Sequence, residues 1–385
     1  MDQEVWIINT IKFGEIKIND EMRKHVIDCL DRDYVTMGPK TKELENLWRD
    51  KFGYKSVKAV GSGTAACTAA CMALYDFGAE PGDQVIVPAL SFIATANAVR
   101  AAGLTPVFCD IRLETMLIDE SKIEGLINDK TRAIMPVSLM GKAPNMPVIR
   151  DIANKNNIMV ILDNCEGHGC KSKGEYMSYW SDMVVYSCYA AHILFSGELG
   201  FVGCSTDDLG DIIESVRSHG RPRNSLYFSH ERYGLNLKPT DLHASIGLGS
   251  FSDFDKIIED RTKNFKYLRE RLQCLNQWFW FTEEESHDTN SPHAFSLTLK
   301  PLSVSLGMSM SGLGEALDNS GVDWKRNFGA MPDHDCFKYL MDKGTCINAT
   351  YVGNNGLHVG VHQYLTLEDL DVISDTIIRY VEEVF

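Results

Sequence analysis

The chain has 385 residues, 44% hydrophobic and 24% charged, which is the composition of a globular protein with room for a large domain and a smaller one. Its formal net charge of −15 opposes binding to a phosphate backbone, so nucleic acid is excluded as an expected partner. No apolar run approaches the roughly 20 residues that span a bilayer, and the first residues form no basic and then apolar leader. We therefore expect a cytoplasmic protein without a membrane partner.

The 11 cysteines are scattered along the chain, odd in number, and include no CxxC pair. This pattern favours neither a disulfide framework nor a zinc site. We expect buried, reduced thiols and no bound metal.

Between about residues 58 and 205, short apolar runs alternate with segments of helical length. The alternation is typical of a mostly parallel sheet that is covered by helices. The predicted strands span residues 84–88, 106–110, 133–139, 158–163, 183–187 and 201–204, and the predicted helices span 64–75, 94–102, 120–127 and 146–156.

From about residue 240 the pattern changes. A long helical stretch reaches residue 272, strands follow around 295–299, and further helices are predicted over 310–319 and 367–384. We therefore predict an N-terminal segment with a large domain over residues 1–250, and a small C-terminal α/β domain over residues 251–385.

A glycine-rich turn at residues 61–66 follows an apolar run and opens an alanine-rich helix. Backbone N–H groups and the helix dipole converge at such a turn, where a phosphate can bind. Glycine–serine turns before helices are common, so the turn alone favours a structural role.

Asp163 and Glu166 stand just past the end of a predicted central strand. Open α/β sheets bind their ligands at this edge. An acid at a strand end is also a frequent helix cap, and the two interpretations are equally good until other segments are joined to this one.

Five segments follow one another along the chain: residues 61–66, 91–95, Asp163, Ser187 with the loop to residue 200, and 234–241. In this order and spacing they resemble the DegT/DnrJ/EryC1/StrS sugar aminotransferase family, from about Tyr34 to the C-terminus. Segments 82–88 and 240–247 also fit the family pattern closely. The resemblance implies the fold-type I architecture of pyridoxal-phosphate enzymes, with a mostly parallel seven-stranded sheet in the large domain and a smaller C-terminal α/β domain.

The resemblance also implies the cofactor, pyridoxal 5′-phosphate (PLP) or its amine form (PMP), and a set of residues around it. Asp163 would pair with the pyridine nitrogen and keep it protonated, and Phe92 would stack on the ring. Glu166 would lie near the ring hydroxyl. The phosphate would be held by Gly63, Thr64 and Ser187, with Asn236 reaching it from the neighbouring subunit of a homodimer with shared active sites.

His192 stands where the family's transaminating members carry their Schiff-base lysine, six residues before Glu198 of the loop. No lysine occurs between Gly174 and Leu237, although a distant one remains open. An imidazole can move a proton at the C4′ atom of the cofactor but cannot form the stable imine. We therefore expect His192 to be a catalytic acid and base.

Within the family, this replacement marks the sugar 3-dehydratases. One kind uses an iron–sulfur cluster held by cysteines after the catalytic loop, and residues 206–273 contain no cysteine, so we expect no cluster. The other kind uses only the cofactor and L-glutamate, and is typified by GDP-4-keto-6-deoxy-D-mannose 3-dehydratase. Segments 36–38, 163–166 and 355–363 resemble it. The resemblance implies deoxygenation at C3 of a nucleotide-linked 4-keto-6-deoxyhexose.

Other interpretations stay open. The chain could be a sugar aminotransferase with an unconventional base, or an inactive homologue in which His192 is structural. A basic segment is equally ambiguous, because it could contact the diphosphate of a nucleotide sugar or form a solvated loop. Its candidate substrate-binding residues are Arg217, His219 and Arg221.

Overall fold

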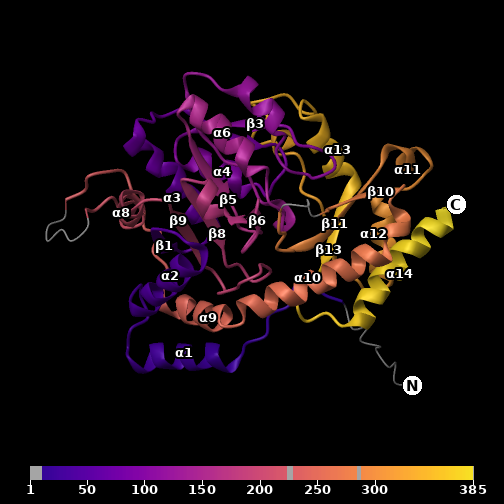
Figure 1. Ribbon diagram of the computed structural model, residues 1–385, viewed down its shortest axis with the longest axis horizontal. Helices are drawn as coiled ribbons and strands as arrows, with labels where there is room; N and C mark the ends of the chain where they lie inside the picture. The colour runs from indigo at the N-terminus through magenta and orange to yellow at the C-terminus, as the bar shows by residue number, and fades with distance from the viewer. Residues whose placement is uncertain (1–10, 223–228, 284–287, 385) are drawn as a thin grey trace.

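The computed structural model describes residues 11–222, 229–283 and 288–384 (Figure 1). Its larger sheet has seven strands in the order β1-β9-β8-β5-β4-β2-β3. All neighbouring pairs are parallel except those made by β9, which runs antiparallel to both β8 and β1. The strands are β1 (Ser56–Val60), β2 (Gln84–Pro88), β3 (Thr105–Cys109), β4 (Thr131–Ile134), β5 (Met159–Asp163), β8 (Met183–Ser187) and β9 (Gly200–Cys204).

Helices cover both faces of this sheet because its central strands are apolar on both sides. In β2, Val85 and Val87 pack into one core and Ile86 into the other, as the period of two requires. The first core is closed by α3 (Gly63–Ala73), α4 (Ala94–Ala101) and α8 (Asp207–Val216). The second is closed by α2 (Pro39–Phe52), α6 (Met146–Asn156) and α9 (Asp241–Phe251).

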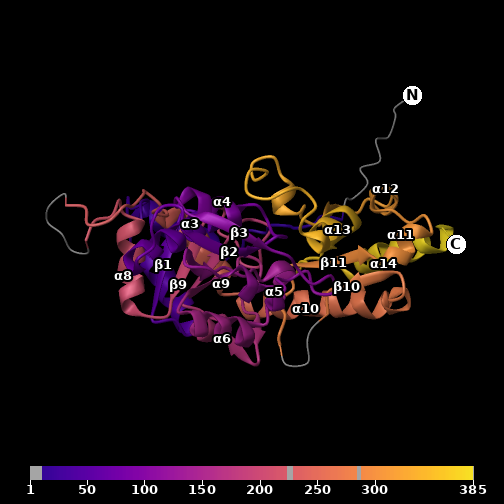
Figure 2. The same ribbon diagram turned by 90° about the horizontal axis from the view of Figure 1, so that it is seen from above.

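A smaller antiparallel sheet in the order β10-β11-β13-β12 forms the other end of the molecule. Its strands are β10 (Phe279–Phe281), β11 (Ala294–Leu299), β12 (Trp324–Arg326) and β13 (Gly356–Gly360). The third core lies between this sheet and α10 (Phe254–Arg271), α12 (Met310–Asn319) and α14 (Leu367–Val384). Figures 1 and 2 show α8 at one end of the molecule and α14 at the opposite end.

The remaining elements are short or lie at the edges. The N-terminal helix α1 (Asp20–Asp31) packs along α9. The others are α5 (Glu120–Ile123), α7 (Met177–Trp180), α11 (Pro301–Ser305), α13 (Ile347–Asn355) and the two-residue strands β6 (Lys171–Ser172) and β7 (Glu175–Tyr176).

The predicted fold class is confirmed: a mostly parallel seven-stranded sheet is followed by a smaller C-terminal α/β unit. The domain division between residues 250 and 251 stays a prediction. Among the described residues, no helix is both long enough and apolar enough to cross a membrane.

Three predicted elements differ from the structure. The helical stretch to residue 272 is two helices, because the chain turns at Ser252 and Asp253 between α9 and α10. The strand predicted over 133–139 ends at Ile134, since Pro136 has no N–H group to donate to a neighbouring strand. The helix predicted over 120–127 is a four-residue α-helix followed by a 3₁₀ turn.

Candidate active site

A cavity of about 640 Å³ lies between the two sheets and receives residues from both. Seven of the residues predicted from the sequence line it: Gly63, Thr64, Phe92, Asp163, Glu166, Ser187 and His192. The lining also includes residues that the sequence analysis did not single out: Phe13, Tyr189, Ala191, His293, Lys325, Arg326, Phe328 and His358.

The N-terminus of α3 opens into this cavity. Ser62 caps the helix by accepting a hydrogen bond from the N–H of Ala65, whereas the N–H groups of Gly63 and Thr64 have no partner among the described residues. A Cβ atom at Gly63 would lie 2.5 Å from the Cβ of Ser187, so only glycine allows this close approach. The helix end therefore offers free donors and a favourable dipole to a phosphate.

Asp163 ends β5 and is buried at the floor of the cavity. Its carboxylate accepts hydrogen bonds from Thr95 Oγ1 at 2.8 Å and from the N–H of Cys165 at 3.2 Å. No cationic side chain among the described residues lies within ion-pair distance of it. A buried carboxylate is costly without a positive partner, and a protonated ring nitrogen in the cavity would provide one.

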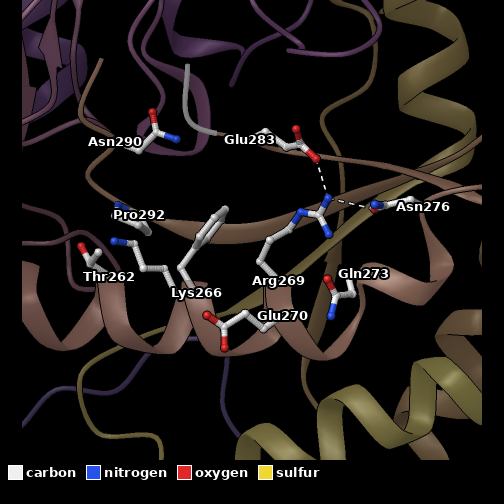
Figure 3. A pocket seen from close by; sticks show the side chains of 10 residues that line it. Thr262, Lys266, Arg269, Glu270, Gln273, Asn276, Glu283, Asn290 and Pro292 are labelled. Carbon is white, nitrogen blue, oxygen red and sulfur yellow. Dashed lines mark hydrogen bonds and ion pairs between the residues drawn. The ribbon is translucent and has the colours of Figure 1, made fainter. Parts of the chain in front are cut away.

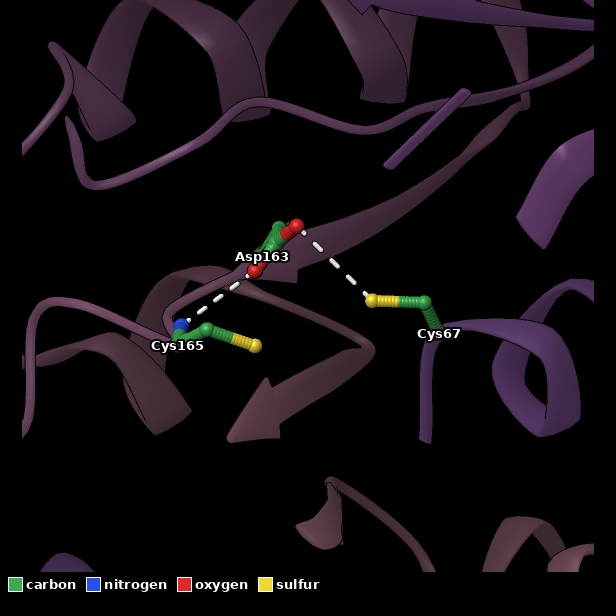
Figure 4. A group of neighbouring side chains, drawn as sticks. All are labelled: Cys67, Asp163 and Cys165. Carbon is green, nitrogen blue, oxygen red and sulfur yellow. Dashed lines mark hydrogen bonds between the residues drawn. The ribbon is translucent and has the colours of Figure 1, made fainter. Parts of the chain in front are cut away.

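Two thiols flank this carboxylate, as Figure 4 shows for Cys67 and Cys165. The ligand atoms of the three residues lie within 4.8 Å of one another. The Cys67 side chain, burial and the Asp163 carboxylate all raise the pKa of Cys165 well above its usual value. Because thiolates, not thiols, bind metals and attack disulfides, this environment favours a neutral, unreactive thiol.

Phe92 follows β2 and is 58% exposed, which is unusual for a large apolar ring beside a cavity. Its ring meets that of Phe328 edge to face, with centroids 6.0 Å apart. An exposed aromatic ring that shares a cavity with a buried carboxylate suits a flat heteroaromatic ligand. Together with Asp163 and the α3 N-terminus, Phe92 makes the lining fit a phosphorylated pyridine ring.

Glu166 is buried in the turn that follows β5 and accepts a hydrogen bond from the N–H of Met140 at 2.7 Å. Desolvation, with the nearby Asp163 carboxylate, raises the pKa of Glu166 to about 7. The side chain can therefore carry a proton at neutral pH and donate it to a ligand oxygen.

We expect Glu166→Gln to stabilise the cofactor-free protein at alkaline pH. The folded pKa of about 7 exceeds the ordinary value of 4.5, so the stability contributed by Glu166 is full below pH 4.5 and is lost as pH rises through 7. Glutamine keeps the acceptor for Met140 but never ionises. In urea titrations the variant should exceed the wild type by about 3 kcal/mol at pH 8. The difference should shrink toward pH 5, and a constant difference would contradict the raised pKa.

His192 lies on the loop that joins the antiparallel strands β8 and β9, and lines the cavity. The loop is closed at its base by the hydrogen bond from the N–H of Cys188 to the carbonyl of Leu199, at 2.8 Å. Desolvation and the positive charge of Arg261 lower the pKa of His192 to about 4. The imidazole is therefore neutral at physiological pH, which is the form that accepts a proton.

The cavity also has a face that sequence reasoning missed. His293 precedes β11 and lies 5.1 Å from His192 between ring centroids, while His358 lies on β13. Lys325 and Arg326 of β12 bring positive charge to the lining, and Lys325 pairs with Asp323 at 3.1 Å. These residues lie in or beside the small sheet. His358 falls within the segment 355–363 that resembles the dehydratase, but none of them was predicted to line the site.

The three basic-segment residues predicted to bind substrate do not line this cavity. Arg217 is buried and donates to the carboxylates of Glu45 and Glu214, each at 2.7 Å. Its guanidinium is thus committed to a buried ion-pair network. His219 and Arg221 are exposed, outside the cavity of this chain, and their contact with a diphosphate stays a prediction.

Asn236 is exposed and does not line the cavity of its own chain. It forms an isolated β-bridge with Ser218 and accepts a hydrogen bond from the Nζ of Lys238. The predicted role of Asn236 in a neighbouring subunit stays a prediction. Nearby Asp241 is structural, because its buried carboxylate accepts from the N–H groups of Gly38 and Thr41 at the start of α2.

A second hollow lies along α10, outside the cavity (Figure 3). Arg269 extends across it and donates to Glu283 and Asn276, and its guanidinium lies 5.0 Å from the ring centroid of Phe281. No predicted site residue lines this hollow. Because Arg269 and Glu283 pair with each other across the hollow, we assign it no ligand.

Known proteins resemble this chain over nearly its full length. GDP-perosamine synthase from Caulobacter vibrioides is 29% identical over 92% of this chain and 94% of its own length. The structure of Escherichia coli GDP-4-keto-6-deoxy-D-mannose-3-dehydratase with bound hydrated PLP is 26% identical, with a TM-score of 0.88 over 96% of this chain and 99% of that one. A structure of GDP-4-keto-6-deoxymannose-3-dehydratase with a trapped PLP-glutamate geminal diamine is 25% identical, with a TM-score of 0.87 over 95% and 100% of the two chains.

The family comparison agrees with the order of motifs and with the geometry of the cavity. Residues 16–378 match a single family, which leaves only the two ends of the chain outside the match. The chain therefore belongs to the DegT/DnrJ/EryC1/StrS aminotransferase family.

Proposed function

We propose that this protein is a PLP- and PMP-dependent 3-dehydratase that uses L-glutamate to remove the C3 hydroxyl of a nucleotide-linked 4-keto-6-deoxyhexose. The observation that carries the proposal is the position of His192 in a cavity that otherwise has the lining of a PLP site. The similarity to two structures of GDP-4-keto-6-deoxymannose-3-dehydratase supports it.

The cofactor residues follow from the lining of the cavity. The free N–H groups of Gly63 and Thr64, with the Ser187 hydroxyl, would bind the phosphate. Asp163 would hold the ring nitrogen in its protonated form, and Phe92 would cover one ring face. When bound, the cofactor supplies an amine or aldehyde at C4′ and a ring that accepts electrons.

His192 moves protons in both halves of the proposed cycle. In the glutamate half it transfers a proton to or from C4′, and in the sugar half it takes up the C4′ proton that is then used for loss of the C3 hydroxyl. The lowered pKa suits the first task, because the neutral imidazole has a free lone pair. A lysine at this position would displace the sugar from the cofactor with its own amine. Histidine cannot form that bond, so water releases the sugar instead.

The overall reaction balances without an iron–sulfur cluster. C3 loses its hydroxyl as water and gains a hydrogen, which is a two-electron reduction. Glutamate provides both electrons as it becomes its keto acid and ammonia. The positive charges of Lys325 and Arg326 in the lining would meet the anionic groups of glutamate and of the nucleotide sugar.

We further propose a homodimer in which Asn236 of the partner subunit completes each site, because that exposed side chain does not line the active-site cavity of its own chain. A boundary near residue 250 would separate the cofactor-binding domain from the small domain. The cytoplasmic location predicted from the sequence stays a prediction.

A second candidate is a nucleotide-sugar aminotransferase with an unconventional base. One observation favours it: Lys325 is the one lysine among the described residues that line the cavity. The similarity to GDP-perosamine synthase is also slightly higher in identity than the similarity to the dehydratase. Against it, the ammonium group of Lys325 is exposed and paired with Asp323, which is a poor setting for a nucleophilic amine.

The product of the reaction distinguishes these candidates. The protein should be incubated with PLP, glutamate and GDP-, CDP-, dTDP- or UDP-linked 4-keto-6-deoxyhexoses, and the sugar nucleotide analysed by mass spectrometry. We expect a product that lacks the C3 oxygen, contains no added nitrogen, and appears with one equivalent of ammonia. An aminated sugar would establish the second candidate, and absence of any turnover across the panel would identify an inactive homologue.

A further inference from the structure

Two imidazoles, not one, face the candidate active site. His293 and His192 both line the cavity, with ring centroids 5.1 Å apart and planes tilted by 36°. They come from different sheets, since His192 follows β8 and His293 precedes β11. At this separation, one oxygen atom of a ligand can lie within hydrogen-bond distance of both rings.

Backbone hydrogen bonds and ring packing hold His293 in place. Its backbone N–H donates to the carbonyl of Met140 at 3.3 Å, and its carbonyl accepts from Arg261 at 3.1 Å. The side chain is 7% exposed, and its ring packs edge to face against Phe13 at 5.9 Å. The protein therefore holds the imidazole in place before any ligand arrives.

The Nδ1 atom of His293 is buried and has no hydrogen-bond partner among the described residues. Leaving such an atom unpaired is costly, and native proteins seldom accept this cost without a reason. The Nδ1 atom of His192 is unpaired in the same way. Both Nδ1 atoms are closed off from the cavity, so a ligand there would meet the Nε2 side of each ring, which forms no hydrogen bond among the described residues.

Neighbouring histidines do not share this combination of features. His168 has an unpaired Nε2 atom but does not line the cavity. His358 lines the cavity, but its Nδ1 lies 3.0 Å from Asn327 Oδ1 and is occupied. His362 is held through both ring nitrogens, by Lys12 and Tyr364.

We propose that His293 is a second acid–base residue of this site, which binds the C3 oxygen of the sugar and delivers the proton with which that oxygen leaves. This inference rests on the proposed 3-dehydratase function. His192 takes the proton from C4′ and passes it to His293. The C3–O bond then breaks with its electron pair on oxygen, the oxygen takes the proton from His293, and water departs.

The electrostatic surroundings of His293 suit a group that transfers a proton without keeping it. Desolvation and the nearby side chains of His192, Arg261, His358 and His168 lower the pKa of His293 well below its ordinary value. An imidazolium with a lowered pKa gives up its proton readily. After transfer, the ring returns to the neutral form that burial favours.

The test separates the two halves of the cycle in the PLP-loaded enzyme. In His293→Phe a flat aromatic ring is kept and both nitrogens are removed. We expect sugar turnover to fall about 100-fold, while the conversion of bound PLP to PMP by glutamate, followed by absorbance, changes less than about threefold because it involves no C3–O bond. Equal losses in both halves, or no loss in either, would overturn the proposal.

A conservative variant keeps the test decisive if the phenylalanine variant folds poorly. His293→Gln retains an amide donor but cannot transfer a proton, so KM for the sugar nucleotide should stay near the wild-type value while kcat falls. A KM increase with unchanged kcat would reduce His293 to a binding residue and overturn the proposal.

A readout independent of turnover uses the PLP-loaded protein without glutamate, with ¹⁵N-labelled histidine. Adding the sugar nucleotide that the wild type consumes should shift one ring-nitrogen resonance that is missing in His293→Phe, and an unshifted resonance would contradict contact with the sugar. Failure of the proposed function is recognised separately, because the wild-type enzyme would then yield an aminated sugar or no product.

Discussion

Replacing His192 with asparagine should lower the rate of the glutamate half-reaction and of sugar dehydration about 10²- to 10⁴-fold, the usual range for loss of a general acid–base group. Both rates should fall because the same imidazole serves C4′ in each half. Asparagine is close to histidine in size and polarity, so PLP binding through Gly63, Thr64 and Asp163 should persist. Stopped-flow absorbance measures the first half, and steady-state product analysis measures the second.

The matched control is His334→Asn, which makes the same chemical change at an exposed histidine outside the cavity. It should retain wild-type rates. If His192→Asn transferred protons as fast as the wild type while binding PLP normally, the assignment of His192 as the acid–base group would be wrong. If only the sugar half slowed, another residue would have to serve the glutamate half.

The elements that sequence could predict well are those with a local signal. The strand Gln84–Pro88 and the helices Met146–Asn156 and Leu367–Val384 have the predicted bounds. Each is an apolar run or helical period bounded by turn residues or by the end of the chain. The break between α9 and α10 was missed because Ser252 and Asp253 are ordinary helix-surface residues, and only tertiary packing requires a turn there. The helix α9 packs in the second core, whereas α10 runs from that core into the third.

The site residues also fall into those that the sequence could predict and those that only the folded structure brings to the cavity. Asp163 could be found because open α/β sheets present their ligand groups at strand ends, and His192 because the resemblance puts the family's lysine at that position. His293 and Lys325 could not, since they reach the cavity only after the small sheet docks against the large domain. Hydrogen bonds such as that from the N–H of Ser291 to the carbonyl of Gly141 join the two parts, and no sequence spacing encodes them.

Arg217 illustrates how a sequence pattern can mislead. A cluster of basic residues in an acidic chain suggested a site for an anion, yet Arg217 is buried and its partners are Glu45 and Glu214 of the same chain. The Glu214 to Arg217 spacing of three residues on a helix was a signal for this ion pair. The second partner, Glu45, is 172 residues away and could be known only from the fold.

The second large effect is expected for Asp163→Asn, which should weaken PLP binding about 100-fold or more, equivalent to about 3 kcal/mol. The cofactor's ring nitrogen would lose its charged partner in a buried site. Asparagine can keep the local hydrogen bonds, because the Thr95 hydroxyl also contacts Ser91 Oγ at 3.0 Å and can reverse its donor direction. Absorbance titration with PLP measures the affinity.

Although Asp163→Asn lowers PLP affinity, it should not lower the free energy of unfolding of the cofactor-free protein. The wild type buries the Asp163 carboxylate without a cation among the described residues, so its neutral replacement should unfold at the same or a higher urea concentration. PLP should raise the melting temperature of the wild type far more than that of the variant, because at one ligand concentration the stabilisation grows with the logarithm of one plus the ratio of the PLP concentration to Kd.

Asp110→Asn provides the matched control for this pair of measurements. Asp110 also follows a strand of the large sheet, but it pairs with Lys122 at 3.3 Å, accepts from the N–H groups of Asn348 and Ala349 at the start of α13, and does not line the cavity. Its replacement should lower stability and leave PLP affinity unchanged, the reverse of Asp163→Asn. If Asp163→Asn instead lost stability while binding PLP normally, the carboxylate would be a structural cap rather than the partner of the ring nitrogen.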